Sequence, residues 1–168
     1  LMKLYIDNRE PKSIINYINY LNENSKNKFI IEIKTLDLGD YIIYDERYDK
    51  QIIIFERKSL SDLESSIKDG RYTEQSFRLS KNDMHNHNII YLIEGSIINY
   101  KNKAFKSVLY STLCSLHFFK GFSLLNSLNN IETAEIIYRF VNKIAKDSNK
   151  KGYYCTKELQ FSESYNRE

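Results

Sequence analysis

Short blocks of apolar residues, separated by polar and charged stretches, predict an alternation of strands and helices along the chain. Six blocks have the length and composition of strands, and they cover residues 3–7, 29–33, 41–44, 51–56, 88–94 and 122–125. Apolar residues at helical spacing predict helices over residues 12–23, 104–119 and 131–145, and two more helical segments after residue 58, divided near Gly70. This order predicts one α/β domain with a central sheet covered by helices on both faces.

The strongest chemical signal lies where the apolar run of residues 52–55 ends in Glu56, Arg57 and Lys58. Charge at the end of a buried strand is costly, and chains tolerate it mostly where the charge binds something. Because side chains alternate along a strand, Glu56 and Lys58 share one face and Arg57 points to the other. A carboxylate beside an ammonium suits phosphodiester cleavage, since the first can hold a divalent metal and the second can steady the attacking water or the charge at phosphorus.

A second carboxylate is needed, because Mg²⁺ prefers octahedral oxygen ligation and one carboxylate holds it poorly. Asp40 begins the third predicted strand, which we expect to form a hairpin with the strand of Glu56, so that the two acids lie side by side. Gly39 permits a tight turn or a close approach there. Asp7 ends the first strand and is a candidate third acid, and Asp62 lies one helical turn farther along as a candidate metal ligand or helix cap.

A third group of polar residues lies on the helical segment that begins at Arg71. Arg71, Gln75 and Arg78 would share one face of that helix, and two guanidiniums with an amide suit contacts with phosphates. Each of these signals also has an ordinary interpretation: a Glu-x-Lys pair on a strand is usually a surface ion pair, an acid after glycine is usually a turn residue, and a basic helix face is usually solvated. Their convergence in one short region favours a metal-dependent nuclease.

Composition limits the remaining possibilities. A net charge of +3 and a pI near 8.7 permit a polyanionic partner without requiring one. Two isolated cysteines give no disulfide framework or zinc site, and no apolar run approaches the ~18 residues that span a bilayer. We therefore expect an intracellular protein with no membrane partner. The chain becomes polar after residue 146, so we expect residues 147–168 to form an extended or disordered tail.

These motifs match a known pattern. Gly39-Asp40, Glu56-Arg57-Lys58 and Asp62 resemble the GD…ERKxxxD signature of the XPF-type structure-specific endonucleases, and the stretch from Asp7 to Glu10 is similar to the DxRE stretch of that family. The resemblance covers roughly residues 3–145. It implies a restriction-endonuclease-like fold, which is a mixed central sheet flanked by helices, with residues 1–146 as the nuclease domain. It also implies Mg²⁺- or Mn²⁺-dependent hydrolysis of DNA at flaps, forks or junctions, in repair or recombination.

The resemblance also assigns roles to residues. Metal ligands would be Asp40, Glu56 and Asp62, a further active-site acid would be Asp7, and the basic positions would be Arg57 and Lys58. Strand alternation gives Lys58 the direct part in this set and Arg57 a supporting one. For DNA contacts we expect Arg9, Arg71, Gln75 and Arg78. The protein would work in the nucleus of a eukaryote, or in the cytoplasm or a virus otherwise.

Other interpretations stay open at this stage. The family includes partner subunits with decayed acidic motifs, so a non-catalytic DNA-binding or scaffold subunit of the same fold is one alternative, and a restriction- or resolvase-like nuclease is another. Family members usually carry tandem helix-hairpin-helix modules after the nuclease, and the residues after 145 are too few to encode two. Family nucleases often form homo- or heterodimers through this domain. Helices 104–119 and 131–145 are candidates for that face, although core packing explains their apolar residues equally well.

Overall fold

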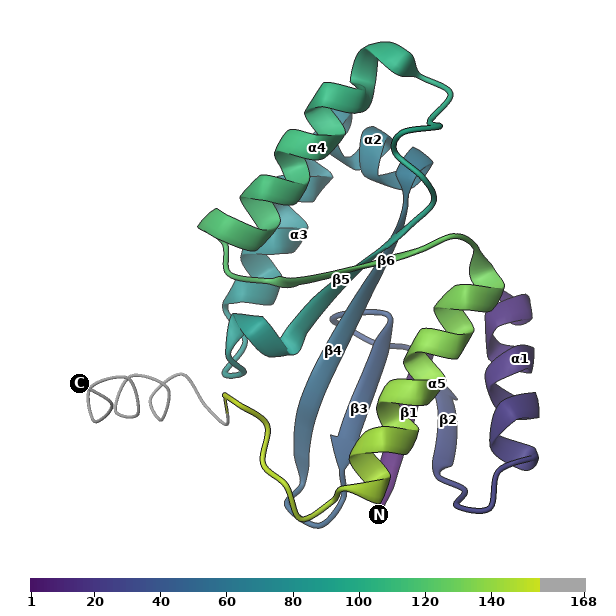
Figure 1. The fold of residues 1–168 in the computed structure, drawn as a ribbon. Helices are drawn as coiled ribbons and strands as arrows, with labels where there is room; N and C mark the ends of the chain where they lie inside the picture. Colours follow the sequence, from purple (N-terminus) through teal and green to yellow (C-terminus); the bar gives the residue numbers. More distant parts are fainter. Residues whose placement is uncertain (155–168) are drawn as a thin grey trace.

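A computed structural model describes residues 1–154 and shows a six-stranded mixed sheet (Figure 1). The strand order is β2-β1-β3-β4-β5-β6. β1 pairs in parallel with β2 and antiparallel with β3, β3 and β4 form an antiparallel hairpin, and β4, β5 and β6 are parallel. The strands are β1 Met2–Asp7, β2 Ile30–Lys34, β3 Tyr41–Asp45, β4 Lys50–Ser59, β5 Ile89–Glu94 and β6 Ser123–Ser127.

Within residues 1–154, five α-helices cover the two faces of this sheet: α1 Lys12–Glu23, α2 Leu60–Asp69, α3 Arg71–Ser80, α4 Lys106–Cys114 and α5 Asn130–Lys146. α1 and α5 lie side by side on one face, and α2, α3 and α4 lie on the other (Figure 1). Short turns η1 Asn86–Asn88 and η2 Lys103–Phe105 precede β5 and α4, and α4 continues as the π-helical turn η3 Ser115–Phe119. No helix within the described residues combines the length and apolar composition that crossing a bilayer requires.

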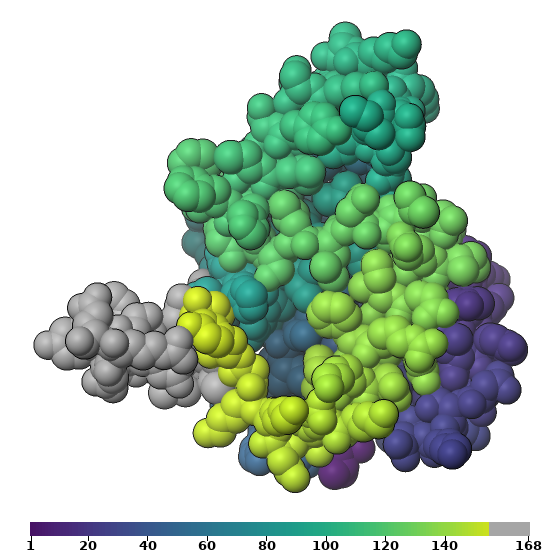
Figure 2. All heavy atoms as spheres, viewed as in Figure 1, coloured from purple at the N-terminus to yellow at the C-terminus, as the bar shows by residue number. Residues whose placement is uncertain are grey.

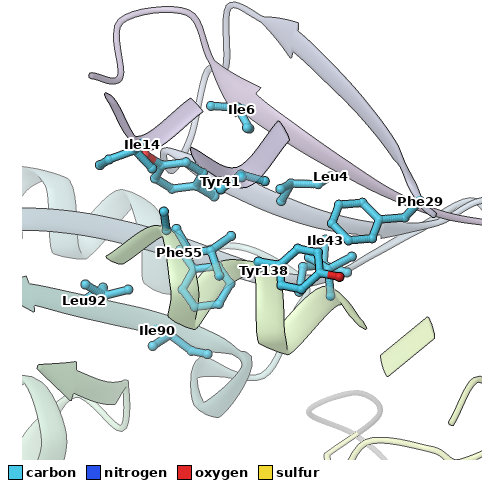
Figure 3. Packing of buried hydrophobic residues seen from close by; sticks show 14 of the residues in the cluster. Leu4, Ile6, Ile14, Phe29, Tyr41, Ile43, Phe55, Ile90, Leu92 and Tyr138 are labelled. Atoms are coloured by element: carbon cyan, nitrogen blue, oxygen red, sulfur yellow. The ribbon is translucent and has the colours of Figure 1, made fainter. Parts of the chain in front are cut away.

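In the described part of the chain, two apolar cores, one on each side of the sheet, set the direction of the side chains on the second half of β4. Phe55 points into the core beneath α1 and α5, where it lies near Tyr41 of β3 and Tyr138 of α5 (Figure 3). Ile54 points into the opposite core, which contains Leu63 of α2 and Leu79 of α3. Alternation therefore sends the side chains of residues 56 and 58 toward α2 and α3 and the side chain between them toward α1 and α5.

One boundary differs from the sequence prediction in a way that matters for the site. The fourth strand was expected to end at Glu56, but β4 continues to Ser59. Parallel pairing with β5 extends it, because Arg57 lies opposite Leu92 and Lys58 opposite Ile93. The charged triplet is therefore held within a central strand rather than in a loop, which fixes where its side chains point.

The corner between α2 and α3 confirms the predicted division near residue 70. Gly70 has φ of +82°, a left-handed conformation that ends α2 and begins α3 without the steric cost that other residues meet. This turn folds α3 back beside α2 over the same face of the sheet, so that both helices overlie the end of β4.

The predicted tail falls largely on residues that the structure does not describe. Its first part does have a defined position: the side chain of Asn88 donates to the backbone oxygen of Tyr154 (2.8 Å), and the ring of His85 stacks on that tyrosine. Figure 2 shows this segment, in yellow, crossing the surface after α5 toward the loop before β5. The expectation of an extended or disordered tail stays a prediction for residues 155–168, which lie outside the described part of the chain.

Candidate active site

Asp40 and Glu56 meet across the hairpin of β3 and β4, as the sequence predicted. Tyr41 pairs with Phe55, which places the preceding Asp40 opposite Glu56. Two hydrogen bonds lock this arrangement: the backbone N–H of Asp40 donates to the carbonyl oxygen of Phe55 (2.8 Å), and the backbone N–H of Arg57 donates to Oδ2 of Asp40 (2.8 Å). Asp40 is therefore held against β4 on both sides of Glu56, by its backbone N–H at Phe55 and by its carboxylate at Arg57.

Gly39 is what allows this close approach. Its φ is +78°, in the left-handed region, and a side chain at this position would collide with the side chain of Ile54 on β4. Any other residue would force the Ile54 side chain or the start of β3 to shift, and would adopt this left-handed conformation at a steric cost.

The electrostatics of the two acids are those of a pair that resists double ionisation. Burial raises the pKa of Asp40 well above its usual range, and the neighbouring charges of Glu56 and Glu10 raise it further. Burial also raises the pKa of Glu56 to about 7, with the positive charge of Lys58 opposing the rise and Glu10 adding to it. Strongly perturbed carboxyl groups with specific charged neighbours are typical of functional sites. A bound cation would favour the ionised form of both.

Lys58 lies on the same side of β4 as Glu56, as alternation predicted. Lys58 is 8% exposed. Its Nζ donates to Oε1 of Gln75 on α3 (2.8 Å) and to Oγ of Ser66 on α2 (3.3 Å). Ser66 is fully buried. The ammonium is therefore anchored to both helices that cover this face of the sheet.

Arg57 points to the opposite side, also as predicted, and is clamped between two glutamates. Its Nε donates to Oε1 of Glu10 (2.7 Å) and its Nη1 donates to Oε1 of Glu94 at the end of β5 (3.0 Å). All three side chains are 13% exposed or less. Thr133 of α5 donates its hydroxyl to the other oxygen of Glu94 (2.6 Å), which ties this ion cluster to the first turn of that helix.

Glu10 is a site residue that the residue-by-residue reasoning missed. Its charge raises the pKa of both Asp40 and Glu56, and its carboxylate pairs with Arg57. The signal that could have found it was its place at the end of the stretch that begins at Asp7 and resembles the DxRE pattern.

Asp7 and Arg9 form a unit of their own at the end of β1. Asp7 is 2% exposed and accepts from Nε of Arg9 (2.8 Å) and from the backbone N–H of Leu36 (2.9 Å). Burial works to raise the pKa of Asp7, but these hydrogen bonds outweigh it and the pKa is lowered. The Arg9 side chain is 73% exposed. Asp7 therefore links the end of β1 to the loop before β3, and Arg9 faces solvent near the site.

Asp62 lies apart from the central acids. It occupies the first turn of α2, is exposed, and its backbone N–H donates to Oγ of Ser59, which caps that helix (3.2 Å). Among residues 1–154, no three acidic, histidine or cysteine side chains are grouped closely enough to hold a metal ion. The structure therefore brings Asp40 and Glu56 together without Asp62, whose metal role stays a prediction.

The predicted face of α3 divides into an inner and an outer part. Gln75 turns inward to Lys58, whereas Arg71 is exposed and pairs with Asp69 (2.7 Å). Arg78 is exposed, donates to the backbone oxygen of Asp37 (3.1 Å), and lies near enough to Glu56 for its charge to oppose the rise in the pKa of that acid. Basic side chains therefore flank the carboxylate pair, which is the arrangement that a phosphate backbone would need.

Comparison with known proteins gives a consistent result. The family model of the ERCC4 domain matches residues 6–140. A probable crossover junction endonuclease mus81 of Dictyostelium discoideum is 47% identical over 113 residues, which are 63% of this chain and 12% of that protein. The crossover junction endonuclease mus81 of Aspergillus fumigatus is 29% identical over 164 residues, which are 86% of this chain and 27% of that protein. The chain thus spans less than a third of the length of either relative.

The fold also has a counterpart among solved structures. The structure of XPF from Aeropyrum pernix in complex with DNA superposes with a TM-score of 0.65 at 26% identity, covering 88% of this chain and 66% of that one. The prediction of a restriction-endonuclease-like mixed sheet flanked by helices is confirmed by this match and by the strand order.

Proposed function

Because the chain belongs to the ERCC4-domain family of XPF-type nucleases, we propose that it is the nuclease domain of a divalent-metal-dependent endonuclease that cuts branched DNA. One observation carries the proposal: Asp40 and Glu56 meet beside Lys58, within a flank of basic side chains. The names of the relatives, which are crossover junction endonucleases, support a branched substrate, and the DNA complex of the solved XPF structure supports DNA as the ligand.

The two central carboxylates fit a hard divalent cation. Asp40 and Glu56 offer only oxygen ligands, and burial, followed by the charge of Glu56, raises the pKa of Asp40, a cost that a cation would relieve. Mg²⁺ commonly binds to one or two carboxylates and takes its other ligands from water and substrate phosphates. We propose that Asp40 and Glu56 hold Mg²⁺ or Mn²⁺ and that Asp62 supports it from the start of α2. When bound, the ion would activate a water and neutralise charge on the phosphate.

The basic residues have distinct parts in the proposed mechanism. Lys58 positions the hydrolytic water or stabilises the developing charge at phosphorus, since its anchored ammonium lies on the face that Glu56 occupies. Arg57 supports the site from the other face, where its ion pairs fix the backbone that holds Asp40. The exposed guanidiniums of Arg9, Arg71 and Arg78 contact the DNA backbone. An enzyme with this substrate would act where DNA lies, which is the nucleus in a eukaryotic cell and otherwise the cytoplasm or a virus.

The exposed apolar residues favour a partner for this domain. The predicted interface was the two helices near residues 104–119 and 131–145. Most of the apolar stripe of α5 is buried in the core beneath it, so core packing explains that helix. α4 and the turn η3 that continues it instead leave large apolar side chains exposed, namely Val108, Tyr110, Phe118 and Phe119, and Leu128 before α5 and Ile131 in its first turn are exposed as well. Patches of this kind usually mark interfaces, and we propose that a second nuclease domain of the same fold, identical or related, covers this one.

Cleavage of a defined substrate panel tests the function. Flap, fork, four-way junction and linear duplex DNA are incubated with Mg²⁺ at stated salt, since phosphate contacts weaken steeply as salt rises. We expect cleavage of at least one branched substrate, its loss in Asp40→Asn and Glu56→Gln, and DNA binding by both variants close to that of the parent. Cleavage by both variants at the parental rate would refute the proposed site. Tight DNA binding by a parent that cuts none of the four would favour the scaffold alternative.

A further inference from the structure

Lys58 has an unusually complete set of neighbours for a lysine. An ammonium group has three N–H donors, and two of them go to Gln75 and Ser66. The residue is 8% exposed, so its four-carbon stem is enclosed as well. Gln75 and Ser66 come from two different helices, which fixes the position of Nζ from two directions. Strand alternation places the Glu56 side chain on the same face of β4 as Lys58, so the anchored ammonium lies on the side of the sheet that holds this carboxylate.

Gln75 is the stronger of the two anchors. Its Oε1 lies 2.8 Å from Nζ, compared with 3.3 Å for Oγ of Ser66, and hydrogen bonds to charged groups are the stronger kind. A glutamine accepts a hydrogen bond from the ammonium and leaves its positive charge uncompensated, whereas an ionised acid would neutralise that charge. The local fold places it there: the left-handed Gly70 turns α3 back over the sheet, so that the inner side of this helix faces β4.

We infer that Gln75, assisted by Ser66, is a positioning residue that holds the Lys58 ammonium beside the carboxylate pair, rather than a residue that grips the DNA backbone. This inference rests on the proposed function and refines it, since the sequence alone grouped Gln75 with Arg71 and Arg78 as a phosphate contact. The structure separates them: both arginines are exposed, while the Gln75 carbonyl oxygen is engaged by Lys58.

The first test measures the accessibility of Lys58 and needs no catalysis. The 168-residue parent, Gln75→Met, Gln75→Glu and the control Gln51→Met are methylated with formaldehyde and a borohydride. The peptide that contains Lys58 is then quantified by mass spectrometry. Methionine matches glutamine in length but offers only a thioether sulfur, a weak acceptor, in place of the amide oxygen. We expect the methylation rate of Lys58 to rise about tenfold in Gln75→Met, which is the equivalent of one hydrogen bond to a charged group. Gln75→Glu, which keeps an acceptor, and Gln51→Met, on an exposed part of β4, should stay at the parental rate.

The second test separates positioning from DNA binding. Single-turnover cleavage in Mg²⁺ gives the rate constant at saturating DNA, and titration in EDTA gives the Kd. Displacement of a catalytic group by about 1 Å can cost roughly 100-fold in rate, so we expect Gln75→Met to lose about that factor in the rate constant with its Kd within twofold of the parent. Ser66→Ala removes the weaker anchor and should change both the methylation rate and the rate constant in the same direction, by a few-fold.

The outcomes are distinguishable. A Lys58 that stays as protected in Gln75→Met as in the parent overturns the inference, and so does a weaker Kd with an unchanged rate constant. Thermal unfolding shows whether the Gln75→Met protein still folds. If it does not, the methylation rate of Lys58 and the cleavage rate constant of Ser66→Ala test the inference instead. If the parent cuts no DNA, the proposed function fails, while the methylation rates still decide whether Gln75 holds Lys58.

Discussion

Replacing Glu56 with glutamine should stabilise the metal-free protein at alkaline pH and leave it unchanged at acidic pH. The pKa of Glu56 is raised from its ordinary value of 4.5 to about 7, first by burial and then by the charge of Glu10, against the opposing charge of Lys58. A raised carboxyl pKa means that the folded state binds the proton more tightly than the unfolded state. The free energy that protonated Glu56 contributes to folding is therefore fully present below about pH 4.5 and is lost as the pH rises through 7.

The size of the effect follows from the same values. At about 1.4 kcal/mol for each pKa unit, a rise from 4.5 to about 7 corresponds to about 3 kcal/mol lost at pH 8. Glu56 keeps some solvent contact, which screens its charge, so we expect about 2 kcal/mol. In a chain of 168 residues, that amount raises the Tm by about 4–8 °C.

The assay is thermal unfolding in EDTA at pH 4 and pH 8, followed by circular dichroism. We expect Glu56→Gln to unfold about 4–8 °C above the parent at pH 8, with little difference at pH 4. The control Glu23→Gln, at the exposed end of α1, should match the parent at both. Adding Mn²⁺ at pH 8 should stabilise the parent and not Glu56→Gln, because metal binding needs the ionised carboxylate. A Glu56→Gln protein that is less stable than the parent at pH 8, or equally shifted at both pH values, would refute the reasoning.

Three further changes test other parts of the structure. Gly39→Ala puts a side chain into a left-handed position that faces β4. It should lower the free energy of unfolding, measured by urea denaturation, by about 2–4 kcal/mol. An unchanged urea midpoint would contradict the close approach of Gly39 to β4. Arg57→Met leaves two buried glutamates unpaired and should cost about 3–5 kcal/mol in the same assay, with a loss below 1 kcal/mol arguing against the ion cluster. Phe118 and Phe119 are both exposed, so replacing both with serine should leave the Tm near that of the parent and weaken self-association measured by sedimentation velocity. A parent that is monomeric and binds no related domain would exclude the proposed interface.

Much of the fold and part of the site follow from local patterns. The period of the apolar residues placed five helices and six strands within a few residues of where they lie, because each element buries one face or stripe. Alternation placed Lys58 and Arg57 on opposite sides of β4, and the hairpin placed Asp40 beside Glu56. These inferences need only the geometry of one strand or of two strands that are close in the sequence.

The remaining features depend on contacts between distant parts of the chain. Arg57 pairs with Glu10, which is 47 residues away in the sequence, and with Glu94, which is 37 residues away. The extension of β4 to Ser59 depends on pairing with β5. Helical spacing put Gln75 on one face with two arginines, but it could not show which of them turns inward, because that is set by how α3 docks on the sheet.

Diffraction from crystals soaked in Mn²⁺ tests the central claim most directly, since the anomalous signal of manganese locates the ion without assumptions about its ligands. We predict one strong peak within bonding distance of a carboxylate oxygen of Asp40 and of Glu56, which vanishes in Glu56→Gln crystals. A peak bound to only one of these acids, or no peak on this side of β4 at a saturating concentration of Mn²⁺, would contradict the shared-metal site.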